Sequence, residues 1–283
     1  MLFIGTSAGE AIPNPFCRCR VCENARKVGG REIRTRSSFM LDNKNVIDLG
    51  ADYLTQAFLR GITLDGVENV IFTHMHSDHI CYNFLWERHV RGEGGDHPLH
   101  VWLSEEGYHF FTDVYLKQKW IGGDGAYCKD VTFHPLKFGE TVQIGDYTAT
   151  PLRGNHRTEF DKNSTNYLLE KGDMRLYYAL DSGYFLEETF AALAGKKLTT
   201  LVMECTNPYT DKPRASEKSP HNDLFLCLRT LDRLYESEAI TADTAIYLSH
   251  ISPFGVTHAE LCDYVTGLDK PYRIHVAYDG LEI

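Results

Sequence analysis

The segment Thr73-His74-Met75-His76-Ser77-Asp78-His79 directly follows an apolar stretch that is typical of a buried strand. In a tight turn at a strand end, His74 and His76 point to one side, whereas Asp78 and His79 point to the other. One short loop can therefore supply ligands to two neighbouring cations. Imidazole suits zinc, iron and manganese, and a carboxylate favours harder ions. A histidine-rich surface loop is the alternative, but the position after an apolar strand favours a metal site.

Further ligand-type residues lie between a predicted strand and a turn: His156, Asp181 and His250. The strands that they follow are predicted over Tyr147–Arg153, Arg175–Leu180 and Thr244–Ser249. Taken alone, each histidine fits a structural role, and Asp-Ser-Gly is ordinarily a turn. One loop cannot complete two metal shells, however, so we interpret these residues as the missing ligands.

Short apolar segments alternate with turn signals along the chain, first mainly as strands and then as strands mixed with helices. This order predicts an α/β fold in which packed sheets are covered by helices. Helices are predicted over Asp52–Arg60, Tyr184–Ala194, Asn222–Ser237 and His258–Leu268. The other predicted strands are Val46–Leu49, Val67–Phe72, Leu99–Leu103, Val131–Leu136, Thr141–Ile144, Thr165–Glu170, Thr199–Met203 and Tyr272–Val276.

The ligand-type residues, in chain order, resemble the five motifs of the metallo-β-lactamase superfamily. The matching positions are Asp48, His74-x-His76-x-Asp78-His79, His156, Asp181 and His250. The resemblance implies an αββα sandwich of two βα halves with a dinuclear metal site at one edge. It also implies two divalent ions, either zinc, manganese or iron.

The same resemblance assigns the ligands. It places His74, His76 and His156 on one ion, and Asp78, His79 and His250 on the other. Asp181 would bridge the two ions, and Asp48 would orient the ligand loop by hydrogen bonds. The complete set looks more like the phosphodiesterase and glyoxalase branches of the family than like the enzymes that hydrolyse β-lactams.

A second candidate metal site is Cys17-Arg-Cys19-Arg-Val-Cys22. Three thiolates on one tight loop supply three corners of a tetrahedron, and a structural zinc needs a fourth ligand from elsewhere. Three free thiols in a reducing compartment are the alternative.

Together with Gly5–Gly9 and Arg34–Ser38, the cysteine motif resembles two narrower branches of the family. One is the accessory phosphodiesterase of the carbon–phosphorus lyase pathway, and the other is the B protein of pyrroloquinoline quinone biosynthesis. In the phosphodiesterase branch a histidine three residues after the last active-site histidine completes the zinc site, but Pro253 occupies that position here. His258 is the nearest substitute, although its place beside Thr257 at a helix start also fits a purely structural role.

Composition narrows the function further. The 283 residues include 29 Lys and Arg against 39 Asp and Glu, a net charge of −10, which disfavours general nucleic-acid binding. No apolar run approaches the length of a membrane span, and the N-terminus reads as a first strand rather than a signal peptide. Eight cysteines without a secretory signal indicate a reducing compartment, so we expect a cytoplasmic protein. A homodimer is an open alternative for the oligomeric state.

We expect a single domain over 1–283, with an N-terminal zinc loop at 17–36. The glycine clusters Gly92–Gly95 and Gly122–Gly125 bound an aromatic-rich stretch, which predicts an inserted lid at 92–130.

The implied chemistry is hydrolysis of small phosphodiesters, with cyclic nucleotide or ribose phosphates as the expected substrates. Two cations about 3.5–4 Å apart lower the pKa of a shared water, and the hydroxide attacks phosphorus. A departing alkoxide needs a proton, for which His221 is the candidate donor, and Glu204 could orient it. The segment Met203–Thr206 before His221 resembles one in tRNA 3′-processing endonucleases, although their tRNA-gripping arm has no counterpart here. Asp78 is a candidate acceptor for the attacking proton.

Several alternatives stay open at this stage. His221 could simply be a histidine at a helix start. The same fold could hydrolyse thioesters or lactones, or act as an oxygenase with one iron in quinone biosynthesis. The non-enzymatic alternative is a metal-stabilised binding protein with an incomplete site.

Overall fold

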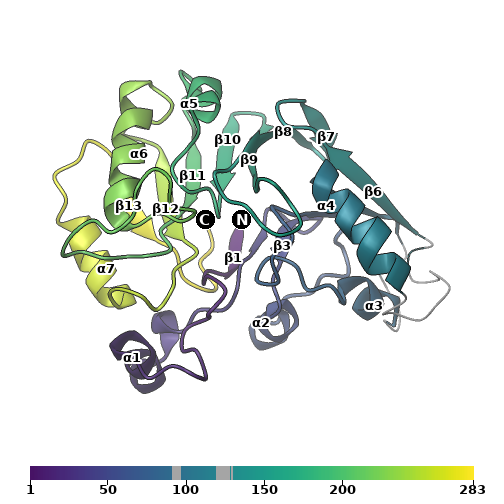
Figure 1. Ribbon diagram of the computed structural model, residues 1–283, viewed down its shortest axis with the longest axis horizontal. Coiled ribbons are helices and arrows are strands. Elements are labelled where there is room, and N and C mark those ends of the chain that lie inside the picture. Colours follow the sequence, from purple (N-terminus) through teal and green to yellow (C-terminus); the bar gives the residue numbers. More distant parts are fainter. Residues whose placement is uncertain (91–96, 119–127, 129) are drawn as a thin grey trace.

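The structure is a computed structural model that describes residues 1–90, 97–118, 128 and 130–283. Its described strands form two sheets (Figure 1). The first sheet has the order β1-β2-β3-β4-β5-β6: β1 (Leu2–Gly5), β2 (Ser38–Met40), β3 (Asn45–Leu49), β4 (Asn69–Ile71), β5 (Leu99–Ser104) and β6 (Val131–Leu136). The second has the order β13-β12-β11-β10-β9-β8-β7: β7 (Val142–Ile144), β8 (Tyr147–Arg153), β9 (Thr165–Lys171), β10 (Met174–Ala179), β11 (Thr200–Glu204), β12 (Ala245–Ser249) and β13 (Ile274–Val276).

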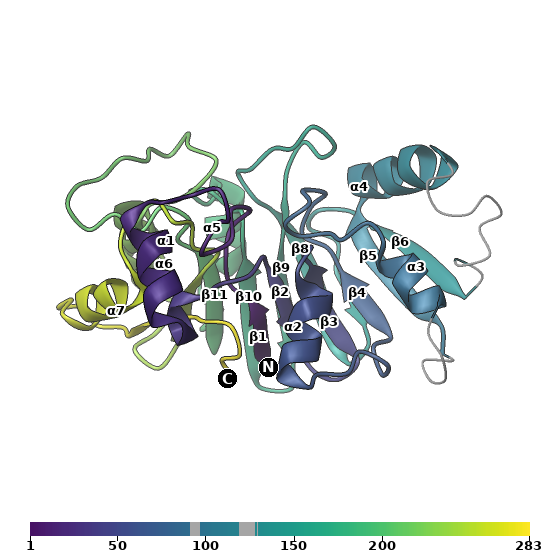
Figure 2. The same ribbon diagram turned by 90° about the horizontal axis from the view of Figure 1, so that it is seen from below.

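Helices cover the outer faces of the two sheets. They are α1 (Arg20–Val28), α2 (Tyr53–Arg60), α3 (Phe84–His89), α4 (Glu105–His109), α5 (Glu187–Leu193), α6 (Leu224–Glu236) and α7 (His258–Thr266). In both views α6 and α7 lie on one side of the strands and α2 and α3 on the other (Figures 1 and 2). None of the helices in the described ranges combines the length and the apolarity that a membrane crossing requires.

The alternation of side chains along the strands produces three apolar layers. In β3, Val46 packs in the layer under α2 and α3, whereas its neighbour Ile47 packs between the sheets. In β11, Leu201 packs in the layer under α5 and α6, whereas Val202 packs between the sheets. Both sheets are therefore buried on both faces, and the predicted α/β sandwich with an αββα arrangement is confirmed.

Parallel pairing explains where the site forms. Strands β3 to β6 run parallel to one another, and so do β10 to β13. The carboxyl ends of parallel strands meet at one edge of a sheet, and in open α/β sheets ligands bind outside that edge. The loops that follow β4, β10 and β12 carry most of the predicted metal ligands, and His156 follows β8, which runs in the same direction as β10.

The helix predictions are confirmed in position, and local chemistry sets their ends. Thr257 and Glu260 form a reciprocal capping box at the start of α7, and Asp223 caps α6 by accepting from the Leu226 N–H at 2.9 Å. The helix α1 was not predicted, because 17–36 was interpreted as a loop. Its buried face consists of Val21, Cys22 and Ala25.

The predicted lid at 92–130 falls partly outside the described residues, including both of its glycine clusters. Within its described part, β5 pairs with β4 and β6 and is thus a strand of the first sheet. The segment that follows β5 forms α4, a π-helical stretch over Phe110–Tyr115 and a short 3₁₀ turn over Leu116–Gln118. Within the described part of 92–130, only the helical segment between β5 and β6 therefore fits an insertion into the sheet.

Candidate metal centre

The predicted ligands converge at the carboxyl edge of the strands, and several have an unusual backbone. Asp48, Asp181 and His250 have φ angles of 58°, 46° and 55°. Residues other than glycine seldom occupy this left-handed region, and such outliers gather at functional sites. The positive φ turns the chain sharply at the end of β3, β10 and β12, which directs these side chains across the edge.

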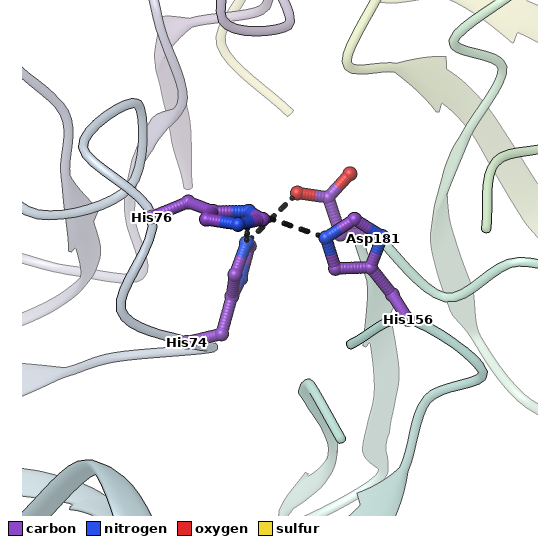
Figure 3. A group of neighbouring side chains, drawn as sticks. All are labelled: His74, His76, His156 and Asp181. Carbon is purple, nitrogen blue, oxygen red and sulfur yellow. Dashed lines mark hydrogen bonds and ion pairs between the residues drawn. The ribbon is translucent and has the colours of Figure 1, made fainter. Parts of the chain in front are cut away.

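The first ligand group consists of His74, His76, His156 and Asp181 (Figure 3). His74 Nε2 lies 3.1 Å from Asp181 Oδ2 and 3.1 Å from His76 Nδ1. His156 Nε2 lies 3.2 Å from the same His76 nitrogen. The four side chains come from both halves of the molecule, because His156 and Asp181 belong to the loops of the second sheet.

The second group shares Asp181 with the first and adds Asp78, His79 and His250. His79 Nε2 lies 2.9 Å from Asp181 Oδ2 and 3.2 Å from His250 Nε2. His250 Nε2 lies 3.4 Å from Asp78 Oδ2 and 3.3 Å from Asp181 Oδ1. The structure therefore brings together all seven residues that the sequence assigned to two metals, with Asp181 common to both groups.

Neighbouring groups hold the second ring nitrogen of each of four histidines. The partners of Nδ1 are Thr73 Oγ1 for His74 at 3.1 Å, Asp48 Oδ2 for His79 at 2.6 Å, the Pro220 carbonyl oxygen for His156 at 3.3 Å and Thr206 Oγ1 for His250 at 3.0 Å. In metal sites such outward bonds fix the orientation of the ring and raise the basicity of the ligating nitrogen. Asp48 thus lies where an orienting residue is expected.

The donor set fits divalent cations. The inward nitrogens of His74, His76 and His156 face one another, so that each can direct a lone pair to one shared cation. Burial, followed by the nearby charge of His79, lowers the pKa of His74 to about 3, which keeps this ring neutral at pH 7. Asp181 is buried, and its Oδ1 lies 3.2 Å from His221 Nδ1 and 3.3 Å from His250 Nε2 without a well-directed hydrogen bond. A shared cation would satisfy both the lone pairs and this carboxylate oxygen.

The carboxylates at the second group also favour a bound cation. Burial alone would lower the pKa of His79, but Asp48, Asp78 and Asp181 raise it well above its ordinary value. Burial alone would raise the pKa of Asp78, but His79 and His250 lower it. A carboxylate with a lowered pKa is suited to bind a metal ion.

His221 and Glu204 lie beside the two groups. His221 Nδ1 is 3.2 Å from Asp181 Oδ1 and 3.3 Å from Glu204 Oε2. Burial opposes protonation of His221, but the adjacent carboxylates of Asp181 and Glu204 raise its pKa to about 11. Glu204 is fully buried and also accepts from the Gly183 N–H at 2.7 Å. The imidazole therefore holds a proton near neutral pH, next to the carboxylate that the metal groups share.

Three supporting residues were missed by the sequence analysis. Thr73 and Thr206 contact the outward ring nitrogens of His74 and His250, and each lies two residues beyond the end of a strand, β4 or β11. Asp161 accepts from the Met75 N–H at 2.9 Å and from Ser104 Oγ at 2.7 Å, which ties the ligand loop to the end of β5. No motif signals Thr206 or Asp161, because His250 and Met75, which they contact, lie far away in the sequence.

The cysteines form a separate group at the start of α1. The thiols of Cys17, Cys19 and Cys22 lie close enough to share one ion. Cys19 Sγ lies 3.7 Å from the Pro253 carbonyl oxygen, so the segment after β12 does approach the cluster.

His258 lies outside the cysteine group. Its Nδ1 is 2.8 Å from Arg34 Nη2 and its Nε2 is 3.5 Å from Cys262 Sγ. Because both ring nitrogens have other partners, the structure does not support His258 as the fourth zinc ligand. Its contacts agree with the structural role considered for it.

A comparison with protein families identifies the class of the chain. The model described as "Beta-lactamase superfamily domain" matches residues 44–242, and the chain belongs to this superfamily. With the two His/Asp groups at the strand ends, it is a member with a metallo-β-lactamase fold, as the resemblance implied. The sequence matched none of the curated proteins with which it was compared.

Several solved structures share this fold at low sequence identity. A structure described as a new diphosphatase from the PhnP family is similar at a TM-score of 0.71 and 20% identity, over 99% of this chain and 94% of that one. Zn(2+)-bound PqqB from Methylobacterium extorquens is similar at a TM-score of 0.69 and 16% identity, over 99% and 98%. The metallo-beta-lactamase fold protein YhfI from Bacillus subtilis is similar at a TM-score of 0.67 and 18% identity, over 99% of this chain and 96% of that one. These likenesses show that the chain shares the fold of these three proteins.

Proposed function

We propose that the protein is a dinuclear metal-dependent hydrolase of small phosphodiesters, such as cyclic nucleotide or ribose phosphates. The observation that carries this proposal is Asp181, whose buried carboxylate is common to two ligand groups. A carboxylate in this position is suited to bridge two cations.

The chemistry fits phosphoester cleavage. When bound, two divalent ions supply Lewis acidity, which lowers the pKa of water toward neutrality and withdraws charge from phosphoryl oxygens. In this proposal Asp78 is a ligand rather than a base, because its pKa is lowered.

His221 gives the site a proton donor. Its Nδ1 faces Asp181 and Glu204, which leaves Nε2 for the leaving-group oxygen. An alkoxide is too basic to depart unprotonated near neutral pH, so general acid catalysis is needed on the natural type of substrate. Glu204 and Thr206 position the ring, since Glu204 Oε2 also accepts from the Thr206 hydroxyl.

Likeness to the diphosphatase supports the substrate class only indirectly, because the identity is 20%. The likeness to PqqB keeps a quinone-biosynthesis oxygenase with one iron as the rival enzyme, and a thioester or lactone hydrolase is a further rival. A metal-stabilised binding protein is disfavoured, because all seven ligand-type residues are present and converge.

A substrate panel tests the proposal. The full-length protein, loaded with Mn²⁺, Zn²⁺ or Fe²⁺, is assayed with bis-p-nitrophenyl phosphate, 2′,3′-cyclic nucleotides, a lactone and a thioester. Hydrolysis of the two phosphodiesters, and no more than trace turnover of the others, is the expected result. Preferential turnover of the lactone or thioester, or none of any substrate in every metal form, would overturn it.

The cysteine group completes the proposal. We propose that Cys17, Cys19 and Cys22 hold one structural zinc and that the protein works in a reducing compartment such as the cytoplasm. A single domain over 1–283 remains our interpretation of the chain.

A further inference from the structure

A mainly apolar cavity of about 240 Å³ lies between α2, α3 and the first sheet. The two helices cover the same face of that sheet (Figures 1 and 2). Val46, Leu49, Val70 and Phe84 are among the residues that line the cavity, and all four are buried in the layer under α2 and α3. The described lining includes none of the seven predicted metal ligands, so the cavity is a site apart from the metal centre.

The size of the cavity limits what it can hold. An apolar cavity of about 150 Å³ in another protein binds benzene, so this one admits in proportion a molecule of about ten non-hydrogen atoms. Leu54 lines the cavity and is 49% exposed, which places an entrance beside α2. Tyr53 and Phe84 bring aromatic rings to the lining, and such rings pack well against the edge or face of a flat ligand.

The charged side chains of α3 in the lining are already paired. Arg88 Nη1 lies 2.9 Å from Asp130 Oδ2, and Arg88 Nη2 donates to the His97 carbonyl oxygen. An anionic ligand would therefore compete with Asp130 for this guanidinium, and it would lie close to Glu87. Apolar walls also offer an ionic ligand no replacement for its hydration. The lining thus disfavours anions, including the phosphoesters proposed for the metal centre.

Glu87 supplies the cavity with a hydrogen-bond acceptor. Its Oε2 accepts from the hydroxyl of Tyr53, which is buried. The other carboxylate oxygen, Oε1, can accept from a ligand hydroxyl. A neutral molecule with an apolar body and one hydroxyl group therefore matches both the walls and this acceptor.

We propose that this cavity binds a neutral aromatic alcohol of about ten non-hydrogen atoms. In this proposal the ring lies among the apolar side chains and the hydroxyl donates to Glu87. The inference goes beyond the proposed function, and it is tested by binding rather than by turnover.

A matched set of compounds tests the inference. Indane, 5-indanol and indane-5-carboxylate share one bicyclic body and differ in a single group, and equilibrium dialysis against the full-length protein measures their binding. We expect one 5-indanol per chain, bound about tenfold more tightly than indane, as suits a hydrogen bond to a charged group. The carboxylate should bind at this site roughly tenfold more weakly than 5-indanol, or less, because its charge loses hydration.

A variant at the entrance locates the binding. Leu54→Trp places a larger side chain there and should weaken both indane and 5-indanol roughly ten- to a hundredfold. The matched control is Leu59→Trp, because Leu59 is an exposed leucine of the same helix that does not line the cavity. The control should bind both compounds as the wild type does.

A second variant tests the acceptor. Glu87→Met should reduce the preference for 5-indanol over indane to near one. Its control is Glu68→Met, which removes a carboxylate that pairs with Lys44 outside the lining and should keep the full preference. Thermal unfolding shows whether each variant is folded, and Leu54→Trp decides alone if Glu87→Met does not fold.

Four results would overturn the inference. They are the absence of saturable 5-indanol binding, binding that Leu54→Trp leaves unchanged, a preference for 5-indanol that survives in folded Glu87→Met, and a carboxylate that binds as tightly as 5-indanol at the site that Leu54→Trp weakens. Failure of the proposed hydrolase function would leave these dialysis results unaffected, so the two failures are distinguishable.

Discussion

Single ring orientations decide what the metal centre can hold. His79 illustrates this, because its Nε2 faces Asp181 at 2.9 Å while its Nδ1 is held by Asp48 at 2.6 Å. Both histidine and aspartate are fully buried, so neither could keep its place by solvation. The positive φ at Asp48 stores local strain that the surrounding contacts must offset.

The variant Asp48→Asn tests this positioning role. The amide has the shape of the carboxylate but not its charge, so we expect metal affinity to fall about 10- to 100-fold. Competition with a chelating dye measures this affinity, and Asp173→Asn in the exposed turn before β10 is the control. Unchanged affinity in Asp48→Asn would show that His79 does not need its partner.

The leaving group should reveal the role of His221. We expect His221→Ala to reduce kcat/KM by about 10²–10⁴-fold on an alkyl or ribose phosphodiester and far less on bis-p-nitrophenyl phosphate, because p-nitrophenolate departs without a proton. Its metal content should be unchanged, whereas His74→Ala should lose metal and both activities together. An equal loss on both substrates in His221→Ala would assign the residue to binding or support instead.

Most ligands could be predicted from the sequence, because a strand end followed by a turn is a local pattern. His156, Asp181 and His250 were found in this way, and the structure brings them together. Partners such as Thr206 and Asp161 could not be found, since their hydrogen bonds join segments far apart in the chain. His258 was predicted as the fourth zinc ligand because it lies close to His250 in the sequence. In the fold its ring nitrogens instead contact Arg34 and Cys262.

At the scale of elements, α1 is built from the cysteine motif. Cys19 is its N-cap residue, and its sulfur accepts from the Cys22 N–H at 3.5 Å. Cys22 lies on the buried face of the helix beside Val21 and Ala25. The sequence analysis predicted a loop over 17–36 and missed this helix. The spacing of the cysteines was interpreted as a metal-binding loop, although the segment is also short and amphipathic.

Replacing Cys19 by Ser tests the link between zinc and this element. We expect zinc at the cysteines to fall from about one ion per chain to near zero, and the midpoint of unfolding to decrease, because metal binding is coupled to folding. Cys81→Ser, outside the group, is the control. Unchanged zinc and stability with reduced turnover would contradict a structural role.

The start of α7 should respond to pH through His258. Burial, followed by the charges of Arg34 and Arg31, lowers its pKa to about 4. The unfolded chain binds this proton near pH 6.5, so the folded state loses stability as the pH falls from about 6.5 to about 4. His258→Gln lacks this proton, and its free energy of unfolding should fall less over the same range. Denaturant titrations at pH 7 and pH 4.5 make the comparison, and equal losses in both proteins would refute it.

For the whole molecule, two packed sheets create the site at their shared edge. The first sheet supplies the loop from His74 to His79, and the second supplies His156, Asp181 and His250. The fold class could be predicted because the strands alternate regularly and the motif order matches the superfamily. The order of strands within each sheet could not be predicted, because pairing such as that of β1 with β2 joins segments that are far apart in the sequence. Local residue patterns do not indicate which strands pair.

Metal analysis of the full-length protein, purified without chelators, tests the central claim most directly. We expect about two divalent ions per chain at the His/Asp centre and one zinc at the cysteines, with Asp181→Ala losing the first two and keeping the zinc. A wild-type protein with no ion beyond one cysteine-bound zinc, or an Asp181→Ala variant with undiminished metal, would contradict a dinuclear centre built around Asp181.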